Sequence, residues 1–273
     1  DVVVIGAGPG GYITAIRASQ LGLKAAVVEK EFLGGICLNV GCIPSKSLLK
    51  NAELAHTLRE RADEFGISFD NLKLDFAAAV DRSRKVSKRL TQGVAFLMKK
   101  NKIDVYMGTA KLTAKDKVQV SDADGKVQEL SAKNIVIATG SHAAMIPGVK
   151  VDGEKVVSFW EAILQTKRPE SVVIIGAGAI GAEFATVWSA YGTQVTMVEM
   201  LPRILPVEDE ETSAELTKAF KKRGINMMTS TKVLGVETTA SGVKVKVSQD
   251  GQETTLEADQ ALVAIGFRPN TAD

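Results

Sequence analysis

Two cysteines, Cys37 and Cys42, are separated by four residues and are the only cysteines in the chain. A thiol pair at this spacing can close a disulfide through a short loop, and exchange with another thiol then needs one exposed and one buried sulfur. If Ile43 or Pro44 opens a helix, the helix dipole lowers the pKa of the Cys42 thiol and stabilises its thiolate. The alternative is a pair of small, buried, unreactive side chains. The glycine-rich sequence around the pair favours redox chemistry.

Two glycine-rich turns of the same design occur in the chain. The first contains Gly6, Gly8 and Gly11, and the second contains Gly176, Gly178 and Gly181. Each turn follows an apolar strand and precedes a helical pattern. A second strand then ends in a glutamate 18 residues after the third glycine, from 11 to 29 and from 181 to 199. The pattern predicts two βαβ units that bind dinucleotides.

The three glycines of each turn have separate purposes. The first permits a tight turn, the second lets a pyrophosphate approach the backbone, and the third lets helix and strand pack closely. The helix N-terminus then offers free N–H groups and the positive end of its dipole to the phosphates.

The glutamates that end these units, Glu29 and Glu199, are expected to accept hydrogen bonds from ribose hydroxyls. A carboxylate at position 199 also repels a 2′-phosphate, so the second unit is predicted to prefer NAD to NADP. Arg203, four residues later, is a basic group that would weaken this preference.

The rest of the chain supplies the elements that position these residues. Apolar periodicity predicts amphipathic helices over 44–65 and 74–100, and alternation predicts short strands within 103–137 and 233–263. Residues 142–148 are interpreted as a linker. The second helix carries a basic face, which we interpret as solvated: Arg82, Arg84, Lys85, Lys88 and Arg89. The fold class is α/β, with two Rossmann-like dinucleotide-binding domains, each a parallel sheet with a small antiparallel β-meander.

Composition excludes several classes of function. The 273 residues carry a net charge of +2 and 5% aromatic residues, which argues against nucleic-acid binding. The sequence has no apolar run of the length that a membrane span needs. Two cysteines and two histidines are too few for a well-spaced structural zinc site, so no metal site is predicted. The chain opens on a strand without a methionine, which we interpret as trimming of a longer protein.

The segment Gly35–Lys46 resembles the active-site segment of the class I pyridine nucleotide-disulfide oxidoreductases, and within them most resembles the dihydrolipoamide dehydrogenases. The resemblance covers the whole chain, including both glycine turns, Ala138–Ser141, Val198–Pro206 and Ala264–Asn270. One departure is Ile36, where the family usually has threonine or valine.

The resemblance implies roles for the residues that match the motif. Cys37 would exchange with substrate, and the Cys42 thiolate would contact the flavin. Lys46 would also contact the flavin and form an ion pair with Glu183 at the junction of flavin and nicotinamide. These four are the candidate catalytic residues. The first glycine turn would bind FAD, and the second NAD.

The remaining cofactor contacts follow from the same resemblance. In addition to the cysteines and Lys46, the expected FAD contacts are Gly6, Gly8, Gly10, Gly11, Glu29, Lys30, Gly35, Ile36, Ala110, Thr139, Gly140 and Ser141. The expected NAD contacts are Gly176, Gly178, Ala179, Ile180, Gly181, Glu183, Glu199, Val233, Ala264 and Gly266.

The resemblance also sets expected domain boundaries. Residues 1–143 would form an incomplete FAD domain, 144–265 the NAD domain, and 266–273 the start of the return to the FAD domain. The family adds a dimerisation domain with a His–Glu acid–base pair, so the intact protein is expected to have roughly 450 residues. Neither His56 nor His142 is expected to be that base, and the chain alone is expected to lack full turnover.

The function implied is oxidation of protein-bound dihydrolipoamide through the cysteine pair and FAD, with hydride passed to NAD⁺. The implied partner is a lipoyl-bearing protein of a 2-oxo-acid dehydrogenase or glycine cleavage complex, with the full-length protein a homodimer in the cytoplasm or mitochondrial matrix. Alternatives within the family are a mercuric or glutathione reductase. An alternative from another class is a non-catalytic nucleotide-binding module.

Overall fold

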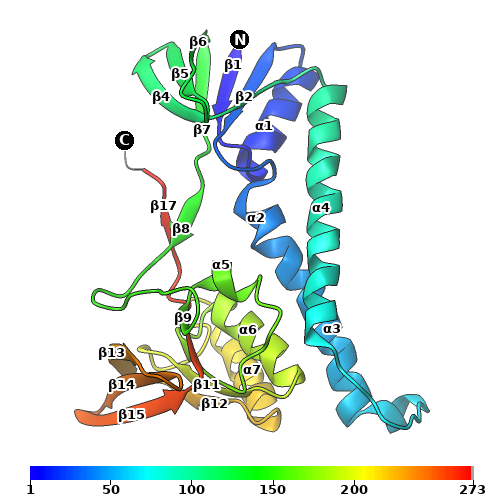
Figure 1. Ribbon diagram of the computed structural model, residues 1–273, viewed down its shortest axis with the longest axis vertical. Coiled ribbons are helices and arrows are strands. Elements are labelled where there is room, and N and C mark those ends of the chain that lie inside the picture. The colour runs from blue at the N-terminus through cyan, green and yellow to red at the C-terminus, as the bar shows by residue number, and fades with distance from the viewer. Residues whose placement is uncertain (272–273) are drawn as a thin grey trace. The chain divides into compact units, whose positions relative to one another are not determined.

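The computed structural model describes residues 1–271 of the chain (Figure 1). These residues divide into two compact units. The first contains Asp1–Pro44, Arg84–His142 and the described part of Arg268–Asp273, and the second contains Ser45–Ser83 and Ala143–Phe267. Residues 45–83 therefore group with the second unit, although they lie within the first domain expected from the sequence. The expected domain boundaries stay a prediction.

The first unit is built on a parallel sheet with the strand order β3-β2-β1-β7. Helix α1 (Pro9–Gln20) connects its two central strands. An antiparallel meander, in the order β4-β5-β6, precedes β7 in the chain. The strands are β1 (Val2–Ile5), β2 (Ala25–Glu29), β3 (Asp104–Met107), β4 (Thr109–Ala114), β5 (Lys117–Ser121), β6 (Val127–Ser131) and β7 (Asn134–Ile137).

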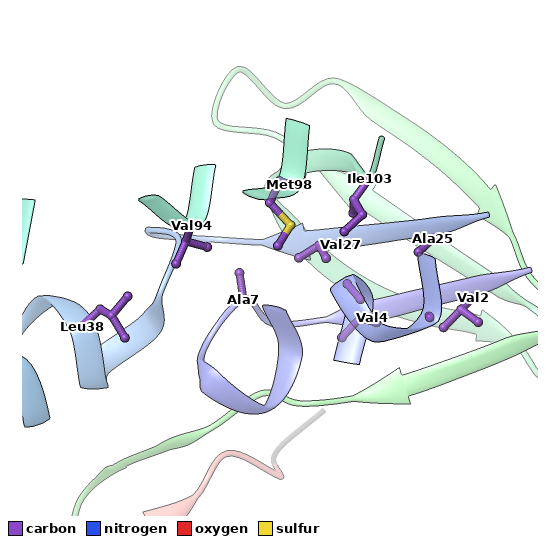
Figure 2. Packing of buried hydrophobic residues seen from close by; sticks show 11 residues of the cluster. Val2, Val4, Ala7, Ala25, Val27, Leu38, Val94, Met98 and Ile103 are labelled. Carbon is purple, nitrogen blue, oxygen red and sulfur yellow. The ribbon is translucent and has the colours of Figure 1, made fainter. Parts of the chain in front are cut away.

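Both faces of this sheet are covered, which explains why its central strands are almost entirely apolar. Val2 and Val4 point to one face and pack with Val94 and Met98 of helix α4 (Phe76–Lys100), as Figure 2 shows. Val3, between them, points to the other face and joins a cluster with residues of the meander. This alternation fixes the register of β1, because a shift by one residue would exchange the two faces.

The second unit repeats the design. Its parallel sheet has the order β12-β11-β10-β16-β9, and its antiparallel meander has the order β13-β14-β15. Helix α6 (Ala179–Ala190) connects β10 to β11. The other elements are β9 (Val156–Val157), α5 (Phe159–Ala162), β10 (Ser171–Ile175), β11 (Gln194–Val198), α7 (Glu210–Lys222), β12 (Asn226–Met228), β13 (Thr231–Thr238), β14 (Val243–Gln249), β15 (Gln252–Ala258) and β16 (Gln260–Val263). The predicted α/β class, with two parallel sheets and two antiparallel meanders, is confirmed.

Several predicted boundaries shift. The helix expected over 44–65 is α3 (Cys42–Glu60), followed by a 3₁₀ turn η1 (Ala62–Phe65) that ends at Gly66, where φ is 66°. The linker expected over 142–148 begins inside strand β8 (Ser141–Ala143), which pairs with β17 (Phe267–Pro269). That interpretation was wrong for its first two residues, because a three-residue strand shows too little alternation to be recognised.

Candidate functional site

Cys37 and Cys42 are joined by a disulfide, with 4.6 Å between their Cα atoms. Cys42 is the first residue of α3, so the expectation that it stands at a helix N-terminus is confirmed. Cys37 lies on a short helix, α2 (Gly35–Asn39), which the sequence did not predict. Cys42 is exposed and Cys37 is half-buried. The two residues of the disulfide therefore differ in exposure.

Glycine geometry forms the redox turn, which we define as residues 34–42. The helix α2 begins after Gly34, whose φ is 87°, and Gly35 has a φ of 58°. Both values lie in the left-handed region, which glycine adopts without the strain of a side chain. Two consecutive glycines before a cysteine were the available signal for this one-turn helix.

The first glycine turn leaves no room for a side chain at two positions. A Cβ on Gly6 would lie 2.2 Å from the Ala138 carbonyl oxygen, and one on Gly11 would lie 1.9 Å from the Gly6 carbonyl oxygen. Helix α1 begins after Gly8, and within residues 1–271 no side chain caps it. Pro9 has no N–H, and the N–H groups of Gly11 and Tyr12 donate to the Gly8 carbonyl. The uncapped N-terminus therefore offers an anionic ligand the positive end of the helix dipole.

The first glycine turn and the redox turn touch each other. The Gly34 N–H donates a 2.8 Å hydrogen bond to the Ala7 carbonyl. A Cβ on Gly35 would lie 2.7 Å from the Gly8 Cα, so the two backbones meet at glycine on both sides. The disulfide is thus anchored beside a helix N-terminus of the phosphate-binding type.

Glu29 shapes the first turn from within. Its carboxylate accepts hydrogen bonds from the Ala7 N–H at 2.7 Å and the Glu31 N–H at 2.9 Å. The residue is only 9% exposed. These bonds hold the carboxylate at the end of β2, where the sequence placed it, and its contact with a ribose stays a prediction.

The second glycine turn has the same internal geometry. A Cβ on Gly176 would lie 2.5 Å from the Ala264 carbonyl oxygen, and one on Gly181 would lie 2.1 Å from the Gly176 carbonyl oxygen. The Glu199 carboxylate accepts hydrogen bonds from the Ala177 N–H at 2.8 Å and the Leu201 N–H at 2.9 Å. This turn also satisfies the backbone requirements of a pyrophosphate site.

Arg203 is bound to its own loop. Its guanidinium forms a 2.6 Å ion pair with Glu210 and donates to the carbonyls of Pro206 and Glu208 at 3.3 and 3.1 Å. A guanidinium with three such acceptors is not free to hold a phosphate. Arg203 was the one residue expected to weaken the preference of the second turn for NAD over NADP. Its engagement within its own loop supports that preference.

Lys46 and Glu183 form the expected ion pair, with 2.6 Å between Nζ and Oε1. Lys46 lies on α3 one turn after Cys42, and Glu183 lies on α6 two residues after Gly181. The lysine side chain is 62% exposed, so the pair contributes only about 0–1 kcal/mol to stability. Both residues belong to the second unit, where the pair joins the part of α3 that follows Pro44 to α6.

These features agree with a family model described as pyridine nucleotide-disulphide oxidoreductase, which matches residues 1–273. The chain belongs to this family. It is 52% identical over 273 residues to a dihydrolipoyl dehydrogenase of Mycobacterium leprae (strain TN), covering 99% of this chain and 58% of that protein. It is 49% identical over 270 residues to a dihydrolipoyl dehydrogenase of Mycobacterium tuberculosis (strain ATCC 25618 / H37Rv), with the same coverage. The chain thus spans 58% of the length of these relatives.

Solved structures share the fold of this family member. LpdA from Mycobacterium tuberculosis is similar at a TM-score of 0.89 and 25% identity, over 99% of this chain and 60% of that one. The HOCl-induced flavoprotein disulfide reductase RclA from Escherichia coli is similar at a TM-score of 0.81 and 24% identity, over 100% of this chain and 57% of that one. The second likeness concerns the fold alone.

Of the other residues expected in this family's cofactor sites, most follow parallel strands or lie in the first turn of a helix, and Ala110 and Val233 lie within the antiparallel meanders. In the first unit, Gly10 opens α1, Lys30 follows β2, Ile36 lies on α2, Ala110 lies in β4 and Thr139–Ser141 follow β7. In the second unit, Ala179 and Ile180 open α6, Val233 lies in β13, and Ala264 and Gly266 follow β16. The ends of parallel strands are where ligands bind in open α/β sheets.

Sequence reasoning missed Asn270, which holds the end of β7. Its amide donates to the Thr139 carbonyl at 2.8 Å, its carbonyl accepts from the Thr139 hydroxyl at 2.7 Å, and its N–H donates to the Gly140 carbonyl. Its side-chain oxygen also lies 2.6 Å from Nδ1 of His142. The available signal was the segment Phe267–Asn270, which the sequence marked only as a point of resemblance.

The basic face of α4 differs from its expected solvated state. Arg82 donates to the Ser47 hydroxyl at 2.8 Å and to the Asn51 side chain at 3.0 Å. Arg84 donates to the Asn39 carbonyl at 2.5 Å and to the Ser87 hydroxyl at 2.9 Å. Arg82 is nevertheless exposed, as expected, and the interpretation was wrong for Arg84 alone, which is half-buried. Helical periodicity shows that side chains share a face but not what packs on it.

Two absences apply to the part of the chain that the structure describes. No helix there is long and apolar enough to cross a membrane. No group of histidine, cysteine or acidic side chains there is arranged to hold a metal ion.

Proposed function

We propose that this chain is the cofactor-binding part of an FAD- and NAD-dependent disulfide oxidoreductase that oxidises protein-bound dihydrolipoyl groups. The observation that carries the proposal is the Cys37–Cys42 disulfide, held against the first glycine turn where Gly35 meets Gly8. The names of the relatives, dihydrolipoyl dehydrogenases, supply the substrate class.

FAD fits the first unit. The pyrophosphate would rest on the uncapped N-terminus of α1, where Gly6 and Gly11 are packed too closely for any side chain. Thr139, Gly140 and Ser141 follow β7, whose carboxyl end lies beside that of β1, and would hold the adenosine half. Gly10, Lys30, Ile36 and Ala110 would complete the contacts.

NAD fits the second unit for the same reasons. Helix α6 begins after Gly178, and a Cβ at Gly178 would meet nothing within 4 Å among the described residues, so a pyrophosphate can approach its backbone. Glu199 would face the ribose and disfavour a 2′-phosphate. Ala179, Ile180, Val233, Ala264 and Gly266 would provide the remaining contacts.

The chemistry of the chain's own residues is thiol–disulfide exchange. A dithiol substrate attacks Cys37, its second thiol displaces Cys37 from the mixed disulfide, and the substrate leaves as a cyclic disulfide. The disulfide gains two electrons and one proton, giving one thiol and one thiolate, and a second proton is released. The N-terminus of α3 stabilises the thiolate on Cys42. FAD, when bound, accepts the two electrons from this thiol pair and delivers them to NAD⁺.

The protons of this exchange need an acid–base group. His142 is engaged with Asn270, and His56 is half-buried, its pKa lowered by burial and by Arg223. We therefore assign neither histidine to this role and propose that a further part of the protein supplies it. In the cell, we propose a homodimer working with a lipoyl-bearing protein of a 2-oxo-acid dehydrogenase or glycine cleavage complex, in the cytoplasm or the mitochondrial matrix.

The test uses the full-length flavoprotein with Cys37→Ser and Cys42→Ser. Both variants should lose dihydrolipoamide:NAD⁺ turnover. Cys37→Ser should retain a thiolate beside the flavin and show a long-wavelength charge-transfer band without any reductant, whereas Cys42→Ser should show none. A wild-type enzyme that reduces glutathione disulfide or Hg²⁺ faster than it oxidises dihydrolipoamide would overturn the substrate class. Turnover that survives both substitutions would overturn the role of the disulfide.

A further inference from the structure

Asn39, the last residue of α2, organises the redox turn. It stands two residues after Cys37, and its Nδ2 donates to the carbonyls of Leu33 and Gly35, both at 2.9 Å. One side chain therefore ties the residue before the glycine pair to the first residue of the short helix. The position of Cys37 in the middle of that helix depends on this side chain.

Helix α4 holds Asn39 from the other side. Nη1 of Arg84 donates to the Asn39 carbonyl at 2.5 Å, and the Thr91 hydroxyl approaches the Asn39 side-chain oxygen at 3.3 Å. Nη2 of Arg84 donates to the hydroxyl of the buried Ser87 at 2.9 Å, which fixes the guanidinium plane. Side chains from two turns of α4 thus form hydrogen bonds with the last residue of α2.

The charge on Arg84 is not neutralised. Among residues 1–271, no carboxylate shifts the pKa of Arg84, and its Nε is buried without a hydrogen-bond partner. Burial lowers the pKa of the guanidinium, which nevertheless stays protonated at any physiological pH. A half-buried, uncompensated cation is screened less by salt than an exposed one, so its field reaches nearby groups.

We propose that Arg84 is a positioning residue that holds Cys37 through Asn39 and, by its charge, biases the Cys37–Cys42 disulfide toward reduction. Reduction by a dithiol converts the disulfide to one thiol and one thiolate and releases one proton, so the protein gains a negative charge. A fixed cation favours that product. The inference rests on the proposed function only in requiring that this disulfide undergoes exchange.

Geometry sets the size of the effect. The guanidinium bonds the carbonyl of Asn39, two residues after Cys37. A helix rise of about 1.5 Å per residue, added to the lengths of the hydrogen bond and the cysteine side chain, puts the charge on the order of 10 Å from the disulfide. At that distance and an effective dielectric constant between about 25 and 35, one charge changes an equilibrium constant about five- to tenfold. For a two-electron couple this is a shift of about 20–30 mV.

The site tolerates the substitutions that a test needs. A cavity of about 340 Å³ lies beside Arg84, lined by Asn39, Arg84, Ser87, Lys88, Thr91 and Gln92. A shorter or uncharged side chain at position 84 therefore meets no packing obstacle. Lys100, exposed at the last residue of α4, offers a matched loss of charge on the same helix.

The experiment equilibrates the full-length flavoprotein with glutathione or dithiothreitol redox buffers and counts reduced Cys37 and Cys42 by alkylation and mass spectrometry. Arg84→Met should lower the equilibrium constant for reduction about five- to tenfold. Arg84→Lys should restore most of it, because it keeps the charge. Thr91→Val, which removes a hydrogen bond but no charge, and Lys100→Met should both stay within about twofold of wild type.

Two results would overturn the proposal. One is an Arg84→Met equilibrium constant within twofold of wild type, and the other is an equal shift in Lys100→Met. If Arg84→Met fails to fold, Arg84→Gln keeps a donor to Asn39 without the charge and carries the same prediction. A wild-type disulfide that does not react with dithiols at all would instead refute the proposed function, so the two failures are distinguishable.

Discussion

The two βαβ units, Val2–Glu29 and Ser171–Glu199, have nearly the same backbone and differ in what lies against it. Gly6 and Gly176 have φ values of 100° and 102°, and each unit's terminal glutamate accepts an N–H from the alanine of its turn. At the second glycine they diverge. A Cβ on Gly8 would meet the Cα of Gly35 at 3.9 Å, whereas one on Gly178 would meet nothing within 4 Å in the described structure.

The divergence begins at the residue after the glutamate. After Glu29 the chain turns back through Gly34 and Gly35 and places the disulfide over the first turn. After Glu199 the loop of Arg203 also returns to its turn, where the Leu205 N–H donates a 2.8 Å hydrogen bond to the Ala177 carbonyl. This loop carries no cysteine, and among the described residues nothing lies within 4 Å of a Cβ at Gly178. One supersecondary unit therefore occurs in two settings: the first lies against the turn that carries the disulfide, and the second keeps space beside its second glycine.

The nucleotide helices are also anchored differently at their C-terminal ends. Ser19 of α1 donates its hydroxyl to the carbonyl of Asn101 at 2.5 Å. In the second unit the carbonyl of Ala190, at the end of α6, accepts a 3.0 Å hydrogen bond from Arg59. A neutral contact holds one helix and a cation holds the other, which suits the negative end of a helix dipole.

The largest expected effect comes from a Cβ at the third glycine. Gly11→Ala and Gly181→Ala each force a methyl group to about 2 Å from a carbonyl oxygen, and each should cost about 3 kcal/mol of stability. Thermal unfolding combined with flavin fluorescence and NAD titration should show loss of flavin in the first variant and loss of NAD binding in the second. Gly93→Ala, in α4 with open space around it, is the control and should raise the melting temperature. Loss of both ligands from either single variant would contradict separate roles for the two turns.

The next largest effect is a difference in the stability lost when each of the two glutamates is substituted. Each accepts two backbone N–H groups, but Glu29 is 9% exposed and Glu199 is more accessible. Glu29→Gln should cost about 2 kcal/mol and Glu199→Gln about 1 kcal/mol, because a buried N–H that loses its acceptor is not rescued by water. Denaturant titration of both variants measures the difference, and a larger loss at Glu199 would reverse the comparison.

Coenzyme choice offers a sharper distinction. Glu199→Gln removes the repulsion of a 2′-phosphate, and Glu210→Gln removes the ion-pair partner of Arg203. In the double variant, the ratio of the affinity for NADP to the affinity for NAD should be about tenfold higher than in Glu199→Gln alone. This is the effect of one charge-assisted hydrogen bond. Calorimetric titration with both nucleotides gives the ratio. Glu211→Gln, at the next position in α7, is the control: combined with Glu199→Gln, it should leave the ratio unchanged. An equal gain with Glu211→Gln would show that the release of Arg203 is not the cause.

The smallest effect is a pH dependence of the second unit. Burial, followed by the charge of Arg223, lowers the pKa of His56 below its usual value of 6.5. Unfolded His56 therefore binds its proton at a higher pH than folded His56, so its stabilising contribution is present above pH 6.5 and is lost as the pH falls through the folded pKa. His56→Gln should lose less melting temperature between pH 7.5 and pH 5 than wild type. An identical loss of melting temperature in both proteins would show that His56 does not cause this pH dependence.

The sequence predicted the features that repeat and missed those that depend on single contacts. Both glycine turns, both terminal glutamates, the helix start at Cys42 and the ion pair of Lys46 with Glu183 were expected from spacing or resemblance, and the structure contains them. Periodicity and motif spacing are local properties, so a sequence reveals them.

The helix around Cys37, the support from Asn270 and the engagement of Arg84 were not expected. The helix α2 is one turn long and has no period to detect. Asn270 and Thr139 are separated by 131 residues, and Arg84 and Asn39 by 45. Hydrogen bonds across such separations depend on the tertiary packing, and no local pattern signals them.

Because the backbones of Gly8 and Gly35 are in contact, the first glycine turn and the redox turn have to be considered together when either is engineered. A side chain gained at Gly35 would enter the first glycine turn, whereas a Cβ at Gly8 would make only an ordinary contact of 3.9 Å with Gly35. Transplanting the redox turn onto a different nucleotide-binding scaffold would therefore require keeping glycine at position 35 and leaving room for its backbone beside the glycine turn. A scaffold that already carries a dinucleotide turn with an open second glycine, such as the chain's own second unit, is the natural recipient for such a graft.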